Sequence, residues 1–237
     1  MTKDIEFIYI NEYAWNVCER PSPASSYVPK WFRDFPPYDS SNNIKIDNRR
    51  TNTTAKKCVP MLDGILSGYI IPLWSDILIS REQFDGNESL NLSWRVSEDV
   101  FELHGDNSKN IPPPAGYQNI VFKFRSMLTI KTPPGYSIMI NQPHGHNDLP
   151  FYAVPAVIDS DGSNHELNFP VWIREGFSGI VEKGTPIVQI TPFKRDSWKS
   201  NFSYMTDKEY QYYFDKEFVS TIKNRYLKRV WSKKDYK

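Results

Sequence analysis

The sequence lacks the features of a membrane, secreted or disulfide-stabilised protein. No stretch approaches the roughly 18 consecutive apolar residues that a membrane-spanning helix needs. The first residues, MTKDIEFIYINEY, carry acidic side chains where a signal peptide has a basic patch and an apolar core. The two cysteines, Cys18 and Cys58, build no disulfide framework, so we expect free thiols in a reducing compartment. We therefore expect a protein that is neither secreted nor in a membrane, but cytosolic or assembled into a particle from the cytosol.

An excess of charge of one sign is also missing, since 29 Lys and Arg residues stand against 28 Asp and Glu residues. Binding of nucleic acid over a broad surface needs a basic excess, so only a local patch could provide it. Residues 223–237 contain such a patch, with seven basic residues and one acidic residue, Asp235. These residues could neutralise a few phosphates, or they could complement the dipole at the end of a helix. We favour the solvated helix face, and expect no membrane partner and no nucleic-acid partner apart from this tail.

What the sequence has instead is a series of short apolar runs, separated by Pro, Gly, Asn and Asp at intervals of about eight to twelve residues. Its aromatic content of 15% suits the packing of strands. The succession of strands without intervening helices excludes a parallel α/β sheet. In the second half, strands are predicted at Val121–Lys131, Tyr136–Ile140, Phe151–Ile158, His165–Trp172, Ser178–Val181 and Pro186–Phe193.

The first half opens with a predicted strand at Ile5–Ile10 and continues into the proline-rich segment Pro21–Asn43. Proline removes a backbone donor and restricts the residue before it, so this segment is expected to be an ordered arm that wraps the core. Its anchors would be the rings of Trp31, Phe32 and Phe35. Further predictions are a short helix around Met61–Leu66, a buried strand pair around Tyr69–Ile79 and a half-buried strand at Leu90–Val96.

The C-terminal region changes to a helical pattern. Thr206 and Glu209 have the spacing of a capping box, which begins a helix. A helix is predicted over Asp207–Trp231, and we expect the face that carries its rings to lie on the core. The residues of that face recur every four positions and are Tyr210, Phe214, Phe218, Ile222 and Tyr226.

These elements predict one mainly β domain, with an antiparallel β-barrel, jelly-roll or β-clip-like core. We divide it into an N-terminal strand and wrapping arm at 1–57, a β-barrel core at 58–200, and a C-terminal helix with a basic tail at 201–237. The division follows the composition, because the core is where apolar runs and turns alternate most regularly.

Two short motifs within residues 157–193 carry a resemblance to a known family. VIDSD at Val157–Asp161 and GTPIVQ at Gly184–Gln189 resemble the V-I-D-x-D-Y and G-x-x-I-x-Q motifs of the trimeric dUTPases. In that family the first aspartate, which corresponds to Asp159, orients the attacking water. The resemblance implies a β-clip fold, usually trimeric, with Asp159 and Asp161 as candidate catalytic residues. Gln189 and Arg174 are the candidate ligand-binding residues.

The sequence also departs from the dUTPase pattern. Gly162 stands where the family has the aromatic residue that stacks on the deoxyribose. The Arg-Ser phosphate-binding signature and the glycine-rich C-terminal arm of the family are not found. The resemblance therefore favours the fold and argues against the activity.

A second resemblance covers residues 28–199. VPKWF, CVPMLDGILSGYIIPLW, PPGYS, VIDSD and KGTPIVQITPFKRDSW follow one another in this order. The series is similar to an uncharacterised domain family of tailed bacteriophages and some bacteria. That resemblance implies a phage or prophage origin, with the host cytoplasm or the virion as the location, and it carries over no functional residue.

The run HGHND offers the candidate metal ligands His144, His146 and Asp148, with His165 as a fourth. On an extended chain every second side chain points to the same side, and imidazole and carboxylate groups suit zinc or iron. The H-x-H spacing resembles that of cupin metal sites, but Pro150 and Phe151 stand where cupins have a glutamate. Because Pro, Gly and Asn form turns, the same run also fits a solvated loop that binds nothing, and we favour the loop.

The carboxylates of Asp159, Asp161, Glu166 and Asp63 could form a cluster for a divalent cation such as Mg²⁺ and a phosphorylated ligand. The sequence DSDG is equally typical of a turn, in which Asp side chains bind their own backbone and Gly takes the positive φ. We favour the turn.

The sequence completes no catalytic constellation, so we predict a phage-type accessory protein that binds or assembles and does not catalyse. Its partners would be further copies of the chain, three by the dUTPase resemblance, or other virion components. Two enzyme hypotheses stay open. One is a diverged dUTPase-like protein that binds or hydrolyses nucleotides, and the other is a cupin-like metal-dependent enzyme that uses HGHND. The cofactor, Zn, Fe or Mg if any, is not determined by the sequence.

Overall fold

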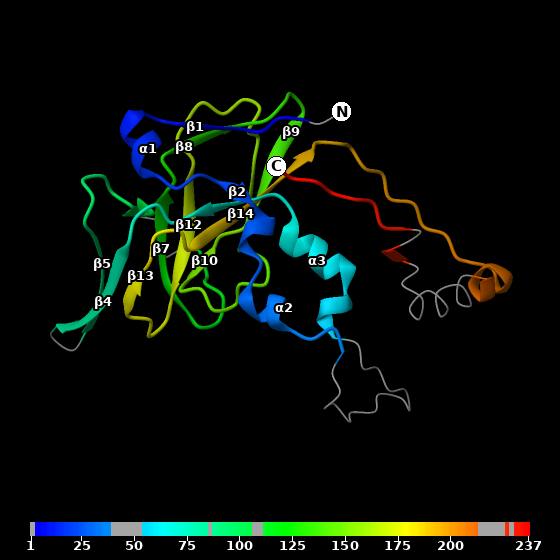
Figure 1. Ribbon diagram of the computed structural model, residues 1–237, viewed down its shortest axis with the longest axis horizontal. Helices are drawn as coiled ribbons and strands as arrows, with labels where there is room; N and C mark the ends of the chain where they lie inside the picture. The colour runs from blue at the N-terminus through cyan, green and yellow to red at the C-terminus, as the bar shows by residue number, and fades with distance from the viewer. Residues whose placement is uncertain (1–2, 39–53, 85–86, 106–110, 213–225, 228–229) are drawn as a thin grey trace.

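The computed structural model describes residues 3–38, 54–84, 87–105, 111–212, 226–227 and 230–237 (Figure 1). It is mainly β, as predicted, with four antiparallel sheets that share one apolar core. The described strands do not close into a barrel, so that part of the prediction is wrong. No described helix is long and apolar enough to cross a membrane.

The five-stranded sheet lies at the centre of the body and carries both dUTPase-like motifs. Buried apolar residues of β3, β9 and β14 form the face of this sheet that packs into the core. The strand order is β11 (Ala156–Ile158), β9 (Tyr136–Asn141), β14 (Pro186–Lys194), β3 (Tyr69–Pro72) and β2 (Ser22–Pro23).

A four-stranded sheet packs against the same core. Phe101, Phe124 and Phe151, from three of its strands, form a buried ring cluster with centroid distances of 5.4 and 5.5 Å. Such ring pairs bury large apolar areas, and they fix the sheet to the core. The strand order is β10 (Phe151–Ala153), β12 (Asn168–Arg174), β7 (Tyr117–Arg125) and β6 (Phe101–Leu103).

Two smaller sheets complete the body. Both are antiparallel and both contribute to the core through alternate residues. One has the order β13 (Gly179–Val181), β4 (Ile77–Phe84) and β5 (Asn87–Trp94), and the other pairs β1 (Glu6–Tyr9) with β8 (Leu128–Lys131).

Some predicted strands differ from the observed ones because the chain changes sheets within them. The predicted strand Val121–Lys131 breaks at Met127, whose φ of 58° turns the chain from β7 into β8. Val154 and Pro155 separate β10 from β11 within the predicted strand Phe151–Ile158, because proline has no N–H to donate to a strand ladder. The strands predicted as a pair around Tyr69–Ile79 are β3 and β4, which belong to different sheets. These breaks divide the predicted barrel into separate sheets with open ends.

The helices are short. Those of the body are α1 (Glu12–Val17), α2 (Lys30–Asp34) and α3 (Val59–Leu66), with 3-10 turns at Ala24–Tyr27 and Ala55–Lys57. α3 confirms the helix predicted around Met61–Leu66. In the segment of the predicted wrapping arm Phe32 is buried, whereas Trp31 and Phe35 are partly exposed and touch ring to ring. Residues 39–43 of that segment lie outside the described residues.

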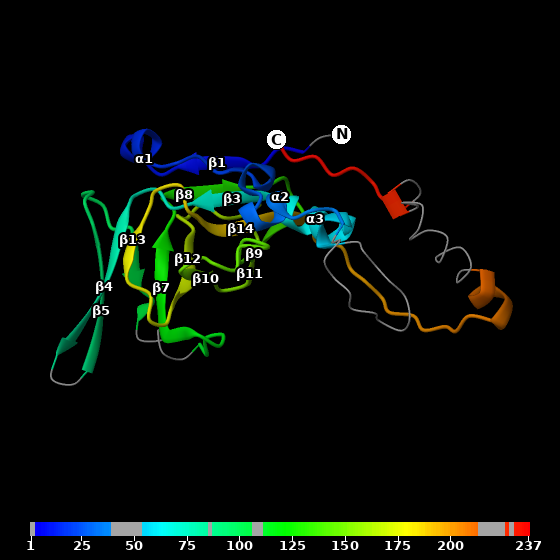
Figure 2. The ribbon, with the colours of Figure 1, turned by 60° about the horizontal axis from the view of Figure 1, so that its bottom comes forward.

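After β14 the chain leaves the body. Residues 196–206, which we call the C-terminal arm, run as an extended chain away from the end of β14 (Figure 2). A helix follows at 207–212, and Thr206 caps it as predicted, because its hydroxyl oxygen accepts from the backbone N–H of Glu209 at 3.4 Å. The Glu209 carboxylate accepts in return from the backbone N–H of Thr206 at 2.9 Å, which completes the capping box. This helix is exposed and does not lie on the core, and Trp231 is not helical, so these two parts of the prediction are wrong. Phe214, Phe218 and Ile222 lie outside the described residues.

Candidate functional site

The two candidate catalytic carboxylates lie in the turn that follows β11. Asp161 accepts a hydrogen bond from the backbone N–H of Gly135 at 2.9 Å and forms a two-point ion pair with the guanidinium group of Arg195. Asp159 accepts a hydrogen bond from the hydroxyl of Ser137 at 2.6 Å, and one of its oxygens lies 3.3 Å from Arg195. The carboxylates therefore do come together, around an arginine.

Arg195 connects the turn after β11 to the five-stranded sheet. It comes directly after β14, and its backbone N–H donates to the carbonyl of Gly135. Its guanidinium also donates to the backbone carbonyl of Tyr136 and to the hydroxyl oxygen of Ser137, both at 3.0 Å. The hydrogen bonds from Arg195 and Gly135 lower the pKa of Asp161. A carboxylate that is held ionised in an ion pair is a poor general base, so the role of Asp161 is to stabilise the turn.

Gln189, a candidate ligand-binding residue, is 1% exposed and points away from the Asp159 turn. Its side-chain amide donates to the carbonyls of Gly64 and Ser67, at 3.1 and 2.6 Å, and its oxygen accepts from the backbone N–H of His144 at 2.8 Å. Gln189 thus joins the end of α3 to the loop at residues 143–149, which we call the histidine loop. All of its hydrogen-bonding groups are used within the protein.

Arg174, the other candidate ligand-binding residue, holds the histidine loop from the opposite end. One of its terminal nitrogens donates to the carbonyls of Asn147 and Leu149, at 2.6 and 2.9 Å. Its guanidinium lies 5.8 Å from the ring centroid of Tyr117. Arg174 follows the register shift of β12, and its Nε is buried without a hydrogen-bond partner among the described residues, so the described contacts of the guanidinium are made by the terminal nitrogen and the ring of Tyr117.

The histidine loop itself lies against the N-terminal segment. The ring of His146 is 2.6 Å from the carbonyl oxygen of Tyr27, and the indole of Trp31 donates to the carbonyl of Gly145 at 2.6 Å. Gly145 has a φ of 79°, and a Cβ there would lie 3.2 Å from Pro29, so glycine suits this position. HGHND is therefore a turn, as the loop interpretation predicts, but Gly145 and His146 pack against the N-terminal segment and are not fully solvated.

The predicted metal ligands are not arranged as a metal site. Among the described residues, no three His, Cys, Asp or Glu side chains are grouped so that they could hold an ion. His146 faces Tyr27, while His165 is exposed and its backbone carbonyl accepts from the hydroxyl of Thr129. Partial burial lowers the pKa of His144, because it disfavours the charged imidazolium.

The other two carboxylates of the predicted cation cluster lie elsewhere. Glu166 is paired with Arg125 at 3.0 Å and accepts from the backbone N–H of Met127, so it holds the break between β7 and β8. Asp63, on α3, accepts from the indole of Trp231 at 2.8 Å and from Lys234 at 2.6 Å. The four carboxylates are distributed over three structural contacts.

A cavity of about 620 Å³ lies between the start of the chain, the turn that precedes β9 and the residues at 235–237. Its walls include three tyrosines, and Lys3 lies 4.7 Å from the ring centroid of one of them, Tyr136. Tyr236 packs edge-on against Tyr69, whose hydroxyl donates to the carbonyl of Lys237. None of the predicted catalytic, ligand-binding or metal-binding residues lines this cavity.

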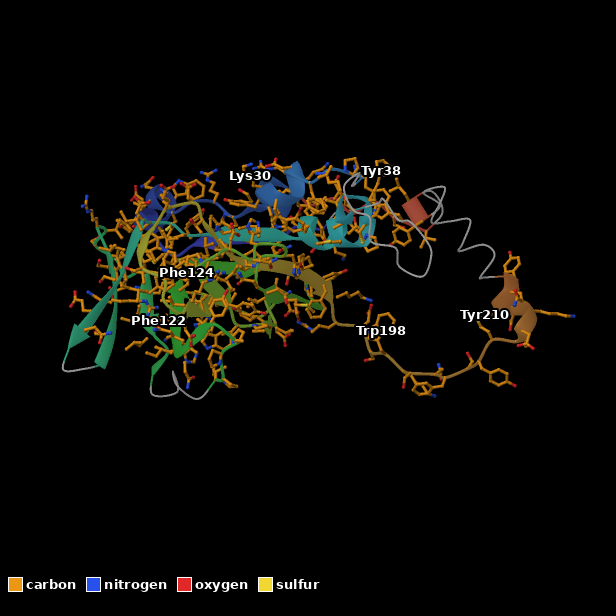
Figure 3. The ribbon with its side chains drawn as sticks, turned by 90° about the horizontal axis from the view of Figure 1, so that it is seen from below. Lys30, Tyr38, Phe122, Phe124, Trp198 and Tyr210 are labelled. Carbon is orange, nitrogen blue, oxygen red and sulfur yellow. The ribbon has the colours of Figure 1, made fainter. Side chains whose placement is uncertain are left out.

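The most unusual surface of the described chain is the C-terminal arm. Trp198, Phe202 and Tyr204 are 91%, 94% and 92% exposed. Figure 3 shows Trp198 near the start of the extended segment, just beyond the edge of the body, and Tyr210 farther out. No role was predicted for Trp198, Phe202 or Tyr204. The signal that could have identified them is three rings within seven residues, after the last predicted strand.

No family model, curated protein or solved structure matches this chain. The dUTPase-like and phage-family resemblances stay predictions from the motifs. The geometry of the candidate site is therefore the main guide to function.

Proposed function

We propose that this protein is a phage-type accessory protein that assembles with further copies of itself through the C-terminal arm and does not act as an enzyme. The observation that carries the proposal is the exposure of Trp198, Phe202 and Tyr204 on a chain that extends away from the body. Exposed apolar groups gathered on one segment are typical of an interaction surface.

The energetic argument concerns the three rings. Each aromatic side chain buries about 150–250 Å² when it is covered. At about 25 cal/mol per Å², covering one ring contributes a few kcal/mol. An extended segment loses conformational entropy when it is ordered. Aromatic side chains offset this loss better than flexible side chains do, because they bury a large area and have few rotatable bonds. The C-terminal arm therefore has the composition of a segment that is stable only when it is bound.

The candidate site supports the second half of the proposal, that the protein is not an enzyme. Asp161, Gln189 and Arg174 all make contacts that hold the fold together. Catalysis usually needs a nucleophile, a base and an oxyanion donor within reach of one another. These three residues do not form such an arrangement. Their roles are those expected of a scaffold for a binding segment.

The finer features of the proposal come from the resemblances. We infer a jelly-roll or β-clip-like ancestry for the body, a trimer as the oligomer, and the virion or the host cytoplasm as the location. The support is the order of motifs along residues 28–199 and the fact that β11 and β14 lie in one sheet, with β9 between them.

The proposal is tested by sedimentation velocity of the full chain over a range of micromolar concentrations. We expect the wild type to associate, and the triple variant W198S/F202S/Y204S to sediment as a folded monomer. The rings are exposed, so their removal should leave the circular dichroism spectrum and the melting temperature unchanged. Equal association of the two proteins, or a monomeric wild type, would refute assembly through the C-terminal arm.

One observation favours the nucleotide-binding alternative, because the side chain of Asp159 is 71% exposed and accessible to a ligand. A nucleotide that binds only the native state must raise its melting temperature. We expect no such rise with dUTP and Mg²⁺. A concentration-dependent rise that is absent in Asp159→Asn would establish the alternative.

A further inference from the structure

A second surface of the protein has the shape and chemistry of a partner for the C-terminal arm. It is a groove of about 470 Å³ between β5 and β6, which we call the β5–β6 groove. This volume lies within the range of about 300–1,000 Å³ that is common for binding pockets. The groove is lined mainly by apolar residues of three strands, Leu90, Leu92, Trp94, Phe101, Leu103, Ile120 and Phe122, with Ser89, Asn91 and Glu102 among them.

The groove lies between the ends of two sheets. β5 is the terminal strand of the sheet β13–β4–β5, and β6 is the terminal strand of the sheet β10–β12–β7–β6. A terminal strand presents backbone N–H and C=O groups that can pair with a further strand. An apolar groove beside such an edge is suited to an added extended segment, whose alternate side chains enter the groove.

The C-terminal arm has the sequence pattern of such a strand. Side chains of an extended chain alternate between two sides, so Trp198, Phe202 and Tyr204 share one side. The opposite side carries only polar residues between Trp198 and Tyr204, namely Lys199, Asn201 and Ser203. At about 3.3 Å per residue, the six steps from Trp198 to Tyr204 span about 20 Å, close to the length of β5.

The charges of the two surfaces are complementary. The charged residues of the C-terminal arm are Asp196, which is paired with Lys194 of β14, and Lys199, which lies among the rings. The connection from β5 to β6 carries Glu98 and Asp99 together with Arg95, and Glu102 lies in the groove itself. Glu102 is partly compensated by Lys123 and Arg125, at 3.6 and 3.5 Å, so the net negative charge near the groove comes from Glu98 and Asp99 and is reduced by Arg95.

The positions of the two surfaces decide which molecule can fill the groove. β4 and β5 lie at one end of the long axis of the molecule and the C-terminal arm at the other (Figures 1 and 2). The arm therefore points away from the groove of its own body. We infer that the C-terminal arm of one copy occupies the β5–β6 groove of a second copy, as an added strand, in a head-to-tail contact. This inference rests on the proposed function and names the receptor for the arm.

The test uses full-length chains with one change in the groove. Leu103 is 60% exposed, so Leu103→Lys should fold normally, while it places a cation in the groove and repels Lys199. We expect the dissociation constant of self-association in sedimentation velocity to rise by about tenfold or more. The matched control is Ile180→Lys on β13, where an equally exposed residue (69%) lies outside the groove, and it should associate as the wild type does.

Mixing two variants tests the head-to-tail geometry directly. Leu103→Lys retains an intact arm, and W198S/F202S/Y204S retains an intact groove. We expect each variant to be monomeric and their mixture to form a 1:1 heterodimer that does not grow further. If the arm variant is monomeric while Leu103→Lys associates like the wild type, the groove is not the receptor and the proposed function still stands. If the wild type and the arm variant behave alike, the proposed function itself fails.

Discussion

Gln189 is a buried amide whose hydrogen bonds all reach backbone groups of two other segments, α3 and the histidine loop. The sequence identified this residue through a motif, G-x-x-I-x-Q, and assigned it to a ligand. In the structure Gln189 binds parts of the protein itself. The backbone N–H of His144 and the carbonyls of Gly64 and Ser67 form the hydrogen bonds that the prediction assigned to a ligand. A motif specifies the residue type, but only the tertiary structure specifies the partner.

We expect Gln189→Met to lower the free energy of unfolding by about 2–4 kcal/mol, since it leaves buried backbone groups without partners while it conserves the volume. Urea denaturation followed by circular dichroism measures the change. Gln83→Met, at an exposed position of β4, is the control and should stay within about 0.5 kcal/mol of the wild type. Similar midpoints for the two variants would show that Gln189 does not hold the loop.

The ion pair between Asp161 and Arg195 predicts a dependence on pH. Hydrogen bonds from Arg195 and Gly135 lower the pKa of Asp161 in the folded state. Its stabilising contribution is therefore present above the pKa of an unfolded aspartate, about 3.9, and is lost as the pH falls through the lower folded pKa. The melting temperature of Asp161→Asn should lie below that of the wild type at pH 6, and the gap should narrow below about pH 4. A gap that stays constant between pH 6 and pH 2 would contradict this role.

At the scale of the elements, the positions of turns were easier to predict than the sheets to which the strands belong. The predicted strands at Tyr136–Ile140, Ser178–Val181 and Pro186–Phe193 are confirmed as β9, β13 and β14. Proline and glycine mark such boundaries in the local sequence. The break at Met127 was missed, because it depends on Glu166, a residue 39 positions away whose carboxylate accepts from the Met127 backbone. Long-range contacts of this kind leave no local pattern.

Gly64 and Gly68 provide a matched pair at the end of α3. A Cβ at Gly68, where φ is +73°, would lie 1.9 Å from the carbonyl oxygen of Ile190 in β14, whereas a Cβ at Gly64 meets nothing within 4 Å. We expect Gly68→Ala to cost about 3 kcal/mol or more, because the clash is with backbone and the conformation is left-handed. Gly64→Ala should stabilise by up to about 1 kcal/mol, since alanine favours the helix.

Urea unfolding midpoints measure both changes. If Gly68→Ala does not fold, its loss from the soluble fraction, beside a soluble Gly64→Ala, gives the same answer. Equal stability of the two variants would show that the backbone of Gly68 does not lie against Ile190 of β14.

At the scale of the whole molecule, the chain leaves the body after β14 and comes back to it before its last residues. The return is fixed at α3, where Asp63 accepts from Trp231 and Lys234, and at β3, where Tyr69 contacts Tyr236. From the sequence, Asp63 was predicted as a candidate cation ligand and Trp231 as the end of a helix. The contact between Asp63 and Trp231 could not be predicted, because 168 residues separate them and no motif connects them.

We expect Asp63→Ala to release residues 231–237 from the body. Backbone amides of this segment should exchange hydrogen for deuterium at least about tenfold faster, because a local opening then costs less free energy. Hydrogen exchange with mass spectrometry measures the rate for C-terminal peptides. Glu209→Ala, which removes only the cap of the exposed helix at 207–212, is the control and should leave this rate unchanged. Unaltered exchange in Asp63→Ala would show that the ring contact of Tyr236 alone fixes the tail.

The placement of the C-terminal arm and the β5–β6 groove at opposite poles has a consequence for growth. A row of copies joined in this way is directional, with an unsatisfied arm at one terminus and an empty groove at the other, so it either closes into a ring or continues to lengthen. A small amount of W198S/F202S/Y204S should then act as a chain terminator. It can occupy the arm-bearing terminus of a row through its groove, but it offers nothing to which the next copy can attach.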